Sequence, residues 1–212
     1  AHVMPGTLAQ LKENAEKALN ENRIAFTAIR TLGTPRRTAL IVEGVAEKQE
    51  DVASENRGPS VKIAFDADGN PTKAAQGFAR GQHVDPKDLV VKDGYVYAEV
   101  HEEGQPTAKI LETLLPELVC GLSFPNNMRW GDLDFKFIRP IRWFVALYGD
   151  DVIPFELANV KSGRTSRGHR FLSQGDFEIA DAKSYEKACE ENFIIVDQDK
   201  RKQMIREQIE AV

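Results

Sequence analysis

Residues 128–150 set three arginines among large aromatic side chains, and this combination strongly constrains how the chain can fold. The segment reads MRWGDLDFKFIRPIRWFVALYGD. So apolar a run predicts buried strands, but Pro140 has no backbone N–H to donate to a ladder and therefore divides the run into two strands. On the second strand Arg142 shares a face with Phe144, which requires a sheet edge or a carboxylate partner.

Helical and strand periodicities follow one another irregularly along the rest of the chain. Amphipathic helices are predicted over 6–23, 71–81, 106–122, 182–192 and from 197 onward. Strands are predicted over 26–46 (two, joined by a Gly-Thr-Pro turn), 89–100 (a hairpin about Asp93-Gly94), 135–139, 141–149, 152–160, 177–179 and 193–196. Because these elements lack regular βαβ alternation, the sequence predicts an α+β fold with mixed, largely antiparallel sheets and flanking amphipathic helices.

The polar run EKQEDVASEN, residues 47–56, indicates a soft domain boundary. We therefore predict a small α/β subdomain over 1–50 and a main α+β domain over 51–175, which contains the aromatic and arginine-rich strands. Residues 176–212 are predicted to begin a further, truncated helical segment.

Signatures of catalysis and of metal binding are missing from the sequence. It has no Walker A motif, no Rossmann glycine fingerprint, no Gly-x-Ser-x-Gly and no His-Glu-x-x-His. The two cysteines and four histidines lack the spacing of zinc ligands. Asp132 and Asp134 stand two apart as a possible acid pair, although such a pair more often caps its own loop. We expect no catalytic residue and no metal ligand in the chain.

Cysteine usage and hydropathy indicate the compartment. Cys120 and Cys189 lie in helix-like contexts, which favours buried thiols in a reducing cytosol over a disulfide. No run of about 18 apolar residues or signal-like start exists, so we expect a soluble, cytoplasmic protein without membrane contact. The formal net charge is −5, so affinity for a nucleic acid requires a local basic patch.

The segment KSGRTSRGHR, residues 161–170, supplies such a patch. It contains Lys161, Arg164, Arg167, His169 and Arg170 and no acidic residue. Guanidinium groups match phosphate geometry, and the accompanying Ser, Thr and Gly residues add neutral donors. A flexible loop that stays in water or pairs with acids elsewhere explains the same composition, and the sequence leaves both interpretations open.

Four stretches, in order along nearly the whole chain, resemble one known family. They are TPRRTALIVEGVA, RGPSVKIAFDADGNPTKAAQGFARGQ, NNMRWGDLDFKFIRPIRWFVALYGDDVIPFEL and SGRTSRGHRFL. Together they are similar to the amino-terminal region of the beta subunit of bacterial heterotetrameric glycyl-tRNA synthetase. The resemblance covers about the first third of that subunit.

The resemblance implies an α2β2 aminoacyl-tRNA synthetase that joins glycine to its tRNA in the cytoplasm. ATP and magnesium are expected to be used by the alpha subunit, with no cofactor bound by this part of the beta subunit. Aminoacylation is expected to require both subunits. The beta subunit is expected to contribute tRNA binding and tetramer architecture, so the chain is expected to form a non-catalytic part of a ligase.

Two hypotheses about the chain's role remain. In the first, basic side chains contact tRNA phosphates, foremost Arg164, Arg167 and Arg170 with Lys161 and His169 beside them. Further candidates for phosphate contact are Arg36, Arg37, Arg57, Lys73, Arg80, Arg129, Arg139 and Arg142. In the second, the region is a protein-interaction scaffold that docks other domains or the alpha subunit without touching RNA, because exposed aromatics with arginine are typical of interfaces.

Overall fold

A computed structural model describes residues 3–66 and 69–211, which separate into two compact units. The first unit combines Ala1–Lys48 with Pro106–Val212, and the second is Gln49–Gln105. This division differs from the segments 1–50, 51–175 and 176–212 that the sequence suggested. The second unit is an insertion: the chain leaves the first unit at Lys48 and returns at Pro106, and these two residues form an isolated β-bridge. A polar run in the sequence indicates one boundary, but it does not show that the chain later re-enters the first unit.

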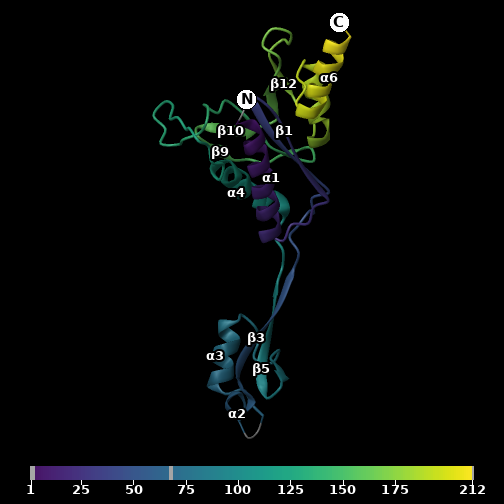
Figure 1. The fold of residues 1–212 in the computed structure, drawn as a ribbon. Coiled ribbons are helices and arrows are strands. Elements are labelled where there is room, and N and C mark those ends of the chain that lie inside the picture. The colour runs from purple at the N-terminus through teal and green to yellow at the C-terminus, as the bar shows by residue number, and fades with distance from the viewer. Residues whose placement is uncertain (1–2, 67–68, 212) are drawn as a thin grey trace. The chain divides into compact units, whose positions relative to one another are not determined.

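Two amphipathic helices and a hairpin build the main core of the first unit (Figure 1). Helix α1 covers Met4–Glu21 and α4 covers Thr107–Cys120, as their periodicities predicted. Strands β1 (Ala28–Thr34) and β2 (Arg37–Glu43) pair antiparallel, with Thr34 opposite Arg37, so the turn consists of Pro35 and Arg36. The buried residues of this core are Leu11, Ala15, Leu19, Ile24, Ile29, Leu111, Leu114, Leu118, Ala146 and Ile153.

The aromatic segment that the sequence assigned to two strands has little regular structure. The predicted strand 135–139 is reduced to one bridge between Phe137 and Met128. The predicted strand 141–149 is divided into β6 (Phe144–Val145) and β7 (Leu147–Tyr148). Ala146 between them is buried. Its N–H donates to the carbonyl of Gly163 at 3.1 Å, and its carbonyl accepts from the N–H of Ile153 at 3.0 Å. The chain therefore changes its pairing partner here from β10 (Val160–Gly163) to β8 (Asp151–Val152). Pro140 therefore interrupts the ladder as expected, but the flanking residues extend through loops.

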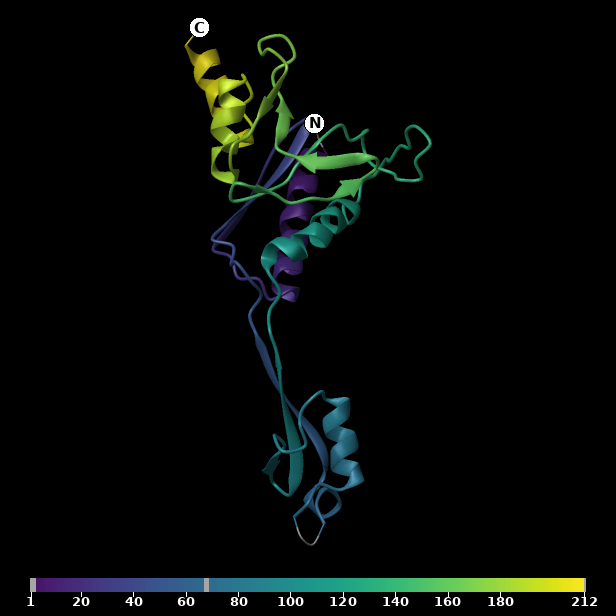
Figure 2. The same ribbon diagram turned by 180° about the vertical axis from the view of Figure 1, so that it is seen from behind.

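The following strands are short. The predicted strand 152–160 forms β8 (Asp151–Val152), β9 (Glu156–Leu157) and the start of β10 (Val160–Gly163). One sheet has the order β6-β10-β9, and β7 pairs with β8. Strands β11 (Thr165–Arg167) and β12 (Asp176–Glu178) form a hairpin. The basic segment 161–170, predicted to be a loop, is therefore mostly strand, and only residues 168–175 loop out (Figure 2).

Residues 176–212 belong to the first unit. The 3-10 helix η1 (Ala182–Ser184) leads into α5 (Tyr185–Glu191), and α6 covers Gln198–Glu210. Leu32 of β1 packs with Cys189, Ile194 and Val196 in a second buried cluster. Residues 193–196 were predicted to be a strand. They contribute one backbone hydrogen bond to β1, from the N–H of Gly33 to the carbonyl of Val196 at 3.1 Å.

The second unit is a small sheet with two helices on it (Figure 1). Its elements are β3 (Val52–Ser60), α2 (Val61–Ala64), α3 (Lys73–Gly81), β4 (Val90–Lys92) and β5 (Tyr95–Glu102), with strand order β3-β5-β4. Asp93 and Gly94 both have positive φ, so the predicted hairpin turn is confirmed. Strand β3 was missed because its sequence, VASENRGPS, is mostly polar.

These elements confirm the α+β class. Every strand pair in the described residues is antiparallel except β6 with β10. None of the helices in the described ranges has both the length and the apolar character that a membrane crossing requires.

Candidate functional site

The turn between β1 and β2 is fastened to strand β11 by Arg37. Its Nη2 donates to the carbonyl oxygen of Arg167 at 2.8 Å, and its Nη1 lies 3.9 Å from the sulfur of Cys189. The Nε of Arg37 is buried and has no acceptor among the described residues. Arg37 therefore points into the fold, whereas Arg36 in the turn is exposed.

The side chains of Arg37 and Arg167 both lie near the ring of Trp143. The guanidinium carbons of Arg37 and Arg167 lie 5.7 and 5.6 Å from the centre of its ring, within the range of cation–π attraction. Arg167 also forms an ion pair with Asp176 across the β11–β12 hairpin, at 3.3 Å. Trp143 is half-buried, and its ring lies within cation–π range of both guanidinium groups.

Two ionisable groups lie behind Arg37. Burial raises the pKa of the Tyr185 phenol, and the charge of Arg37 opposes this only in part. Burial also raises the pKa of the Cys189 thiol, again against the opposing effect of Arg37. Cys189 is buried as predicted, while Cys120 is exposed, contrary to the expectation of two buried thiols. Both groups are neutral at physiological pH, so Arg37 has no anionic partner in this cluster.

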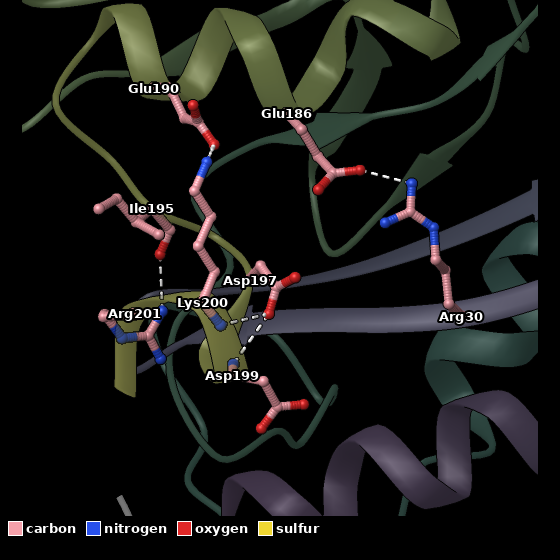
Figure 3. Close-up of polar contacts among 8 residues, drawn as sticks. All are labelled: Arg30, Glu186, Glu190, Ile195, Asp197, Asp199, Lys200 and Arg201. Carbon is pink, nitrogen blue, oxygen red and sulfur yellow. Dashed lines mark hydrogen bonds and ion pairs between the residues drawn. The ribbon is translucent and has the colours of Figure 1, made fainter. Parts of the chain in front are cut away.

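Polar contacts attach α5 and α6 to the hairpin (Figure 3). Arg30 of β1 forms an ion pair with Glu186 of α5 at 2.5 Å. Lys200 of α6 pairs with Glu190. Arg201 donates to the carbonyls of Ile195 at 2.6 Å and Gly33 at 3.1 Å. These contacts occupy the two acids of α5 that face the hairpin and α6.

The carboxylate of Asp197 caps α6. It accepts from the N–H groups of Asp199 at 2.8 Å and Lys200 at 3.1 Å (Figure 3). Satisfying these orphan donors and placing an anion at the positive helix end both stabilise the first turn. The helix predicted from residue 197 onward therefore begins at Gln198, directly after this cap.

Loop 168–175, between β11 and β12, is held by a histidine. His169 Nδ1 accepts from the N–H groups of Phe171 and Leu172, each at 3.3 Å. The N–H of His169 donates to the carbonyl of Asn192 at 3.0 Å, and Gly168 donates to Gly175 at 2.8 Å. The loop is therefore closed at its base and tied to the end of α5, and its tip carries exposed side chains.

A groove of about 2610 Å³ adjoins this loop and the β1–β2 turn. Its floor is largely apolar, from β2, α4 and residues 137–148. Its volume exceeds the roughly 300–1,000 Å³ that is typical of small-molecule pockets. Exposed Arg36, Arg139, Arg142 and Arg170 line it, and within the described residues none of the four has an ion-pair partner.

The remaining basic candidates of the first unit behave differently from one another. Arg164 donates to the carbonyls of Asp150 at 2.7 Å, Ala180 at 2.8 Å and Ile179 at 3.3 Å, which engages its guanidinium within the fold. Arg129 lies 3.8 Å from Asp134, both side chains being exposed, and such pairs contribute little. Lys161 is exposed on β10. Phosphate contacts by these residues stay predictions.

Three candidates lie in the second unit. Arg57 of β3 stacks on Tyr95 with 3.6 Å between its guanidinium carbon and the ring centre. Lys73 begins α3, and Arg80 is exposed near its end. The structure therefore distributes the predicted basic residues over two units, and the first unit alone brings Arg36, Arg37, Arg167, His169 and Arg170 together.

Metal ligands do not gather in the described residues: nowhere there do three His, Cys, Asp or Glu side chains form a metal-binding group. Sequence reasoning missed one exposed group. Phe171 is 83% exposed at the tip of loop 168–175, directly after the basic run. The signal was the pair Phe171-Leu172 in a segment otherwise rich in Gly, Ser and Arg.

Comparison with known proteins gives a consistent picture over the full chain. A family model described as glycyl-tRNA synthetase beta subunit matches residues 1–212. The chain is 50% identical to the glycine–tRNA ligase beta subunit of Desulfitobacterium hafniense over 216 aligned residues, covering 100% of this chain and 31% of that protein. The corresponding protein of Desulforamulus reducens is 47% identical with the same coverage. That of Lactococcus lactis is 45% identical, with 32% of its length covered. The chain thus spans about a third of the length of these curated relatives.

Proposed function

The chain belongs to the glycyl-tRNA synthetase beta subunit family, and from that premise we propose that it is a non-catalytic amino-terminal part of such a subunit. In this role it contributes to tRNA binding and to subunit architecture during ATP-dependent glycylation of tRNA. Its partners are an alpha subunit, in an α2β2 assembly, and tRNA. The site of action is the cytoplasm.

ATP and magnesium chemistry belongs, in this proposal, to the alpha subunit. Magnesium prefers oxygen ligands from carboxylates, and in the part of the chain that the structure describes no cluster of three acidic or other ligating side chains forms. No catalytic step is assigned to this chain.

The observation that carries the tRNA-binding role is the unpaired cationic rim of the groove. Arg36 and Arg170 are exposed and lack carboxylate partners among the described residues, while neighbouring acids are occupied, Asp176 by Arg167 and Glu186 by Arg30. Arg36 and Arg170 therefore place unpaired positive charge on this groove although the chain as a whole is acidic. Such a patch attracts phosphates and releases their counterions.

Salt dependence tests this role. In the full-length protein assembled with its alpha subunit, replacing Arg36 and Arg170 by Gln removes two proposed phosphate contacts. The slope of log affinity for tRNA against log salt should fall in magnitude by about 1 to 2. The matched control replaces Lys17 and Lys109, exposed lysines on α1 and α4, by Gln and removes the same charge. Equal slopes for the two double variants would remove this surface from the tRNA site.

A scaffold role without RNA contact is favoured by one feature of α6. Ile205 and Ile209 are 51% and 70% exposed and stand four residues apart, which makes a small apolar stripe on one face. The test is replacement of both by Ser in the full-length protein. Weaker association with the alpha subunit at unchanged tRNA affinity would favour the scaffold role.

A further inference from the structure

Phe171 stands out among the large apolar side chains of the first unit by its exposure. It is 83% exposed, and its neighbour Leu172 is 61% exposed. An aromatic ring left in water forgoes the burial that would otherwise stabilise it by about 1.5–3 kcal/mol. Loop 168–175 extends past the ends of β11 and β12 (Figure 2). A partner is the simplest reason to hold a ring there.

The loop that carries this ring is preorganised. The two hydrogen bonds to His169 Nδ1 fix the backbone of residues 171 and 172, and the N–H of Ser173 donates to the carbonyl of His169 at 3.1 Å. A Cβ added at Gly168 would lie 1.8 Å from the Oγ of Ser173, so this position requires glycine. A fixed loop loses little conformational entropy on binding, which suits a recognition element.

The surroundings of the ring are cationic. The guanidinium carbon of Arg170 lies 5.9 Å from the centre of the Phe171 ring. Arg36 and Arg170 line the same groove, and the contact between Arg37 and Arg167 brings the β1–β2 turn to the base of this loop. Burying Phe171 in an apolar protein pocket would desolvate Arg170 as well, which is costly without a carboxylate partner.

A nucleotide satisfies both groups at once. Its base offers a π-face to the ring, and its phosphate offers an anion to the guanidinium. Only unpaired bases are free to stack in this way, because bases in a duplex already stack on each other. We propose that Phe171 is a stacking platform for an unpaired nucleotide of the bound RNA, with Arg170 contacting an adjacent phosphate. This proposal rests on the tRNA-binding role proposed above for the same surface.

Substitutions at two adjacent positions separate stacking from charge. Phe171→Leu keeps an apolar side chain and removes the ring, so in the full-length, assembled protein tRNA affinity should fall about 5- to 150-fold. The salt slope should stay at the wild-type value, because no charge is lost. Phe171→Trp keeps a π-face and should bind within about threefold of wild type. Arg170→Gln should lower both the affinity and the slope, the latter by about 1.

Leu172→Ala is the matched control at the same tip, and its tRNA affinity should stay within about threefold of wild type. If Phe171→Leu binds tRNA like wild type, or if Leu172→Ala weakens binding as much as Phe171→Leu does, stacking is overturned. In that case the arginine variants show how far the failure extends. If Arg36→Gln and Arg170→Gln flatten the salt slope, only the stacking role of Phe171 is overturned. If these two variants leave the salt slope unchanged, the proposed tRNA-binding surface is overturned as well.

A photo-reactive benzoylphenylalanine at position 171 gives an independent readout with purified tRNA and alpha subunit. A cross-link to tRNA supports the proposal. A cross-link to the alpha polypeptide alone, together with normal tRNA affinity of Phe171→Leu, would overturn it in favour of a protein partner.

Discussion

The guanidinium of Arg37 reaches the backbone carbonyl of Arg167, with 2.8 Å between Nη2 and the oxygen, and so joins two hairpins that are 130 residues apart in sequence. This contact orients the β1–β2 turn toward the base of loop 168–175. One arginine of the pair Arg36-Arg37 is thereby committed to the fold, and the other remains available to a partner.

Arg37→Met should destabilise the first unit, whereas Arg36→Met should not. The methionine retains part of the packing against Trp143 but loses the donor to the Arg167 carbonyl, which should cost about 1–2 kcal/mol in the free energy of unfolding. We expect no larger cost in the free energy of unfolding, because the Nε of Arg37 has no acceptor among the described residues and its removal breaks no hydrogen bond. Arg36 is exposed, so its variant should stay within about 0.5 kcal/mol. Urea unfolding followed by tryptophan fluorescence measures both, and equal midpoints would contradict the assignment.

Arg164→Met should act on stability and not on RNA affinity. Its three carbonyl acceptors, from Asp150, Ile179 and Ala180, would lose a charged donor, at a cost of about 2–3 kcal/mol. The control Lys161→Met removes the same charge from an exposed position on β10 and should change stability by less than about 0.5 kcal/mol.

Thermal unfolding and the salt slope of tRNA binding distinguish the two roles of Arg164. A flatter slope for Arg164→Met at wild-type stability would support the phosphate role that the sequence suggested.

Local patterns predicted the elements whose determinants are local. Helix α1 was predicted from apolar spacing, the hairpin turn from the Asp93-Gly94 dipeptide, and α6 from the charged segment that starts at 197, and the structure has all three. The same information did not separate Arg164 from Arg170, which stand six residues apart in one basic segment. Their difference depends on carbonyls at 150, 179 and 180, which only the folded chain brings to Arg164.

In the aromatic segment, strands were predicted from sequence that the folded chain largely lacks. Phe135 and Phe137 have strong β-propensity, but they pack on each other and on Phe124 and Trp130 in a loop, without a partner strand beyond one bridge. Propensity reports fit to a pleated surface, and it yields when tertiary contacts bury the same rings in another way. Strand β3 illustrates the converse, because pairing with β5 stabilises a polar sequence.

Gly104→Ala should strongly destabilise the second unit. A Cβ there would lie 1.9 Å from the carbonyl oxygen of Gln49, a backbone atom that cannot rotate away. The N–H of Gln49 donates to the carbonyl of Gln105 at 3.0 Å, so the two ends of the unit would be forced apart, at a cost of about 2–4 kcal/mol.

Gly81→Ala at the end of α3, where a Cβ meets nothing within 4 Å, is the matched control and should be neutral or stabilising. Amide exchange of β3 and β5 measures the effect within this unit. Unchanged protection in Gly104→Ala would contradict the close approach.

Alkaline pH should destabilise the first unit through Cys189 and Tyr185. Burial raises the pKa of both groups, whose ordinary values are 9.0 and 10.0, so above these values the folded state retains protons that the unfolded state has lost. The free energy of unfolding should therefore fall as pH rises beyond about 9, by at most ~1.4 kcal/mol per pH unit for each fully titrating group. Between pH 6 and 8 both groups are neutral in both states and contribute no slope. Cys189→Ala with Tyr185→Phe removes both titrations, so the double variant should be less stable at pH 7 but lose stability less steeply between pH 9 and 10.5. Urea unfolding at each pH measures the two slopes, and parallel curves over the alkaline range would show that these buried groups do not cause the loss.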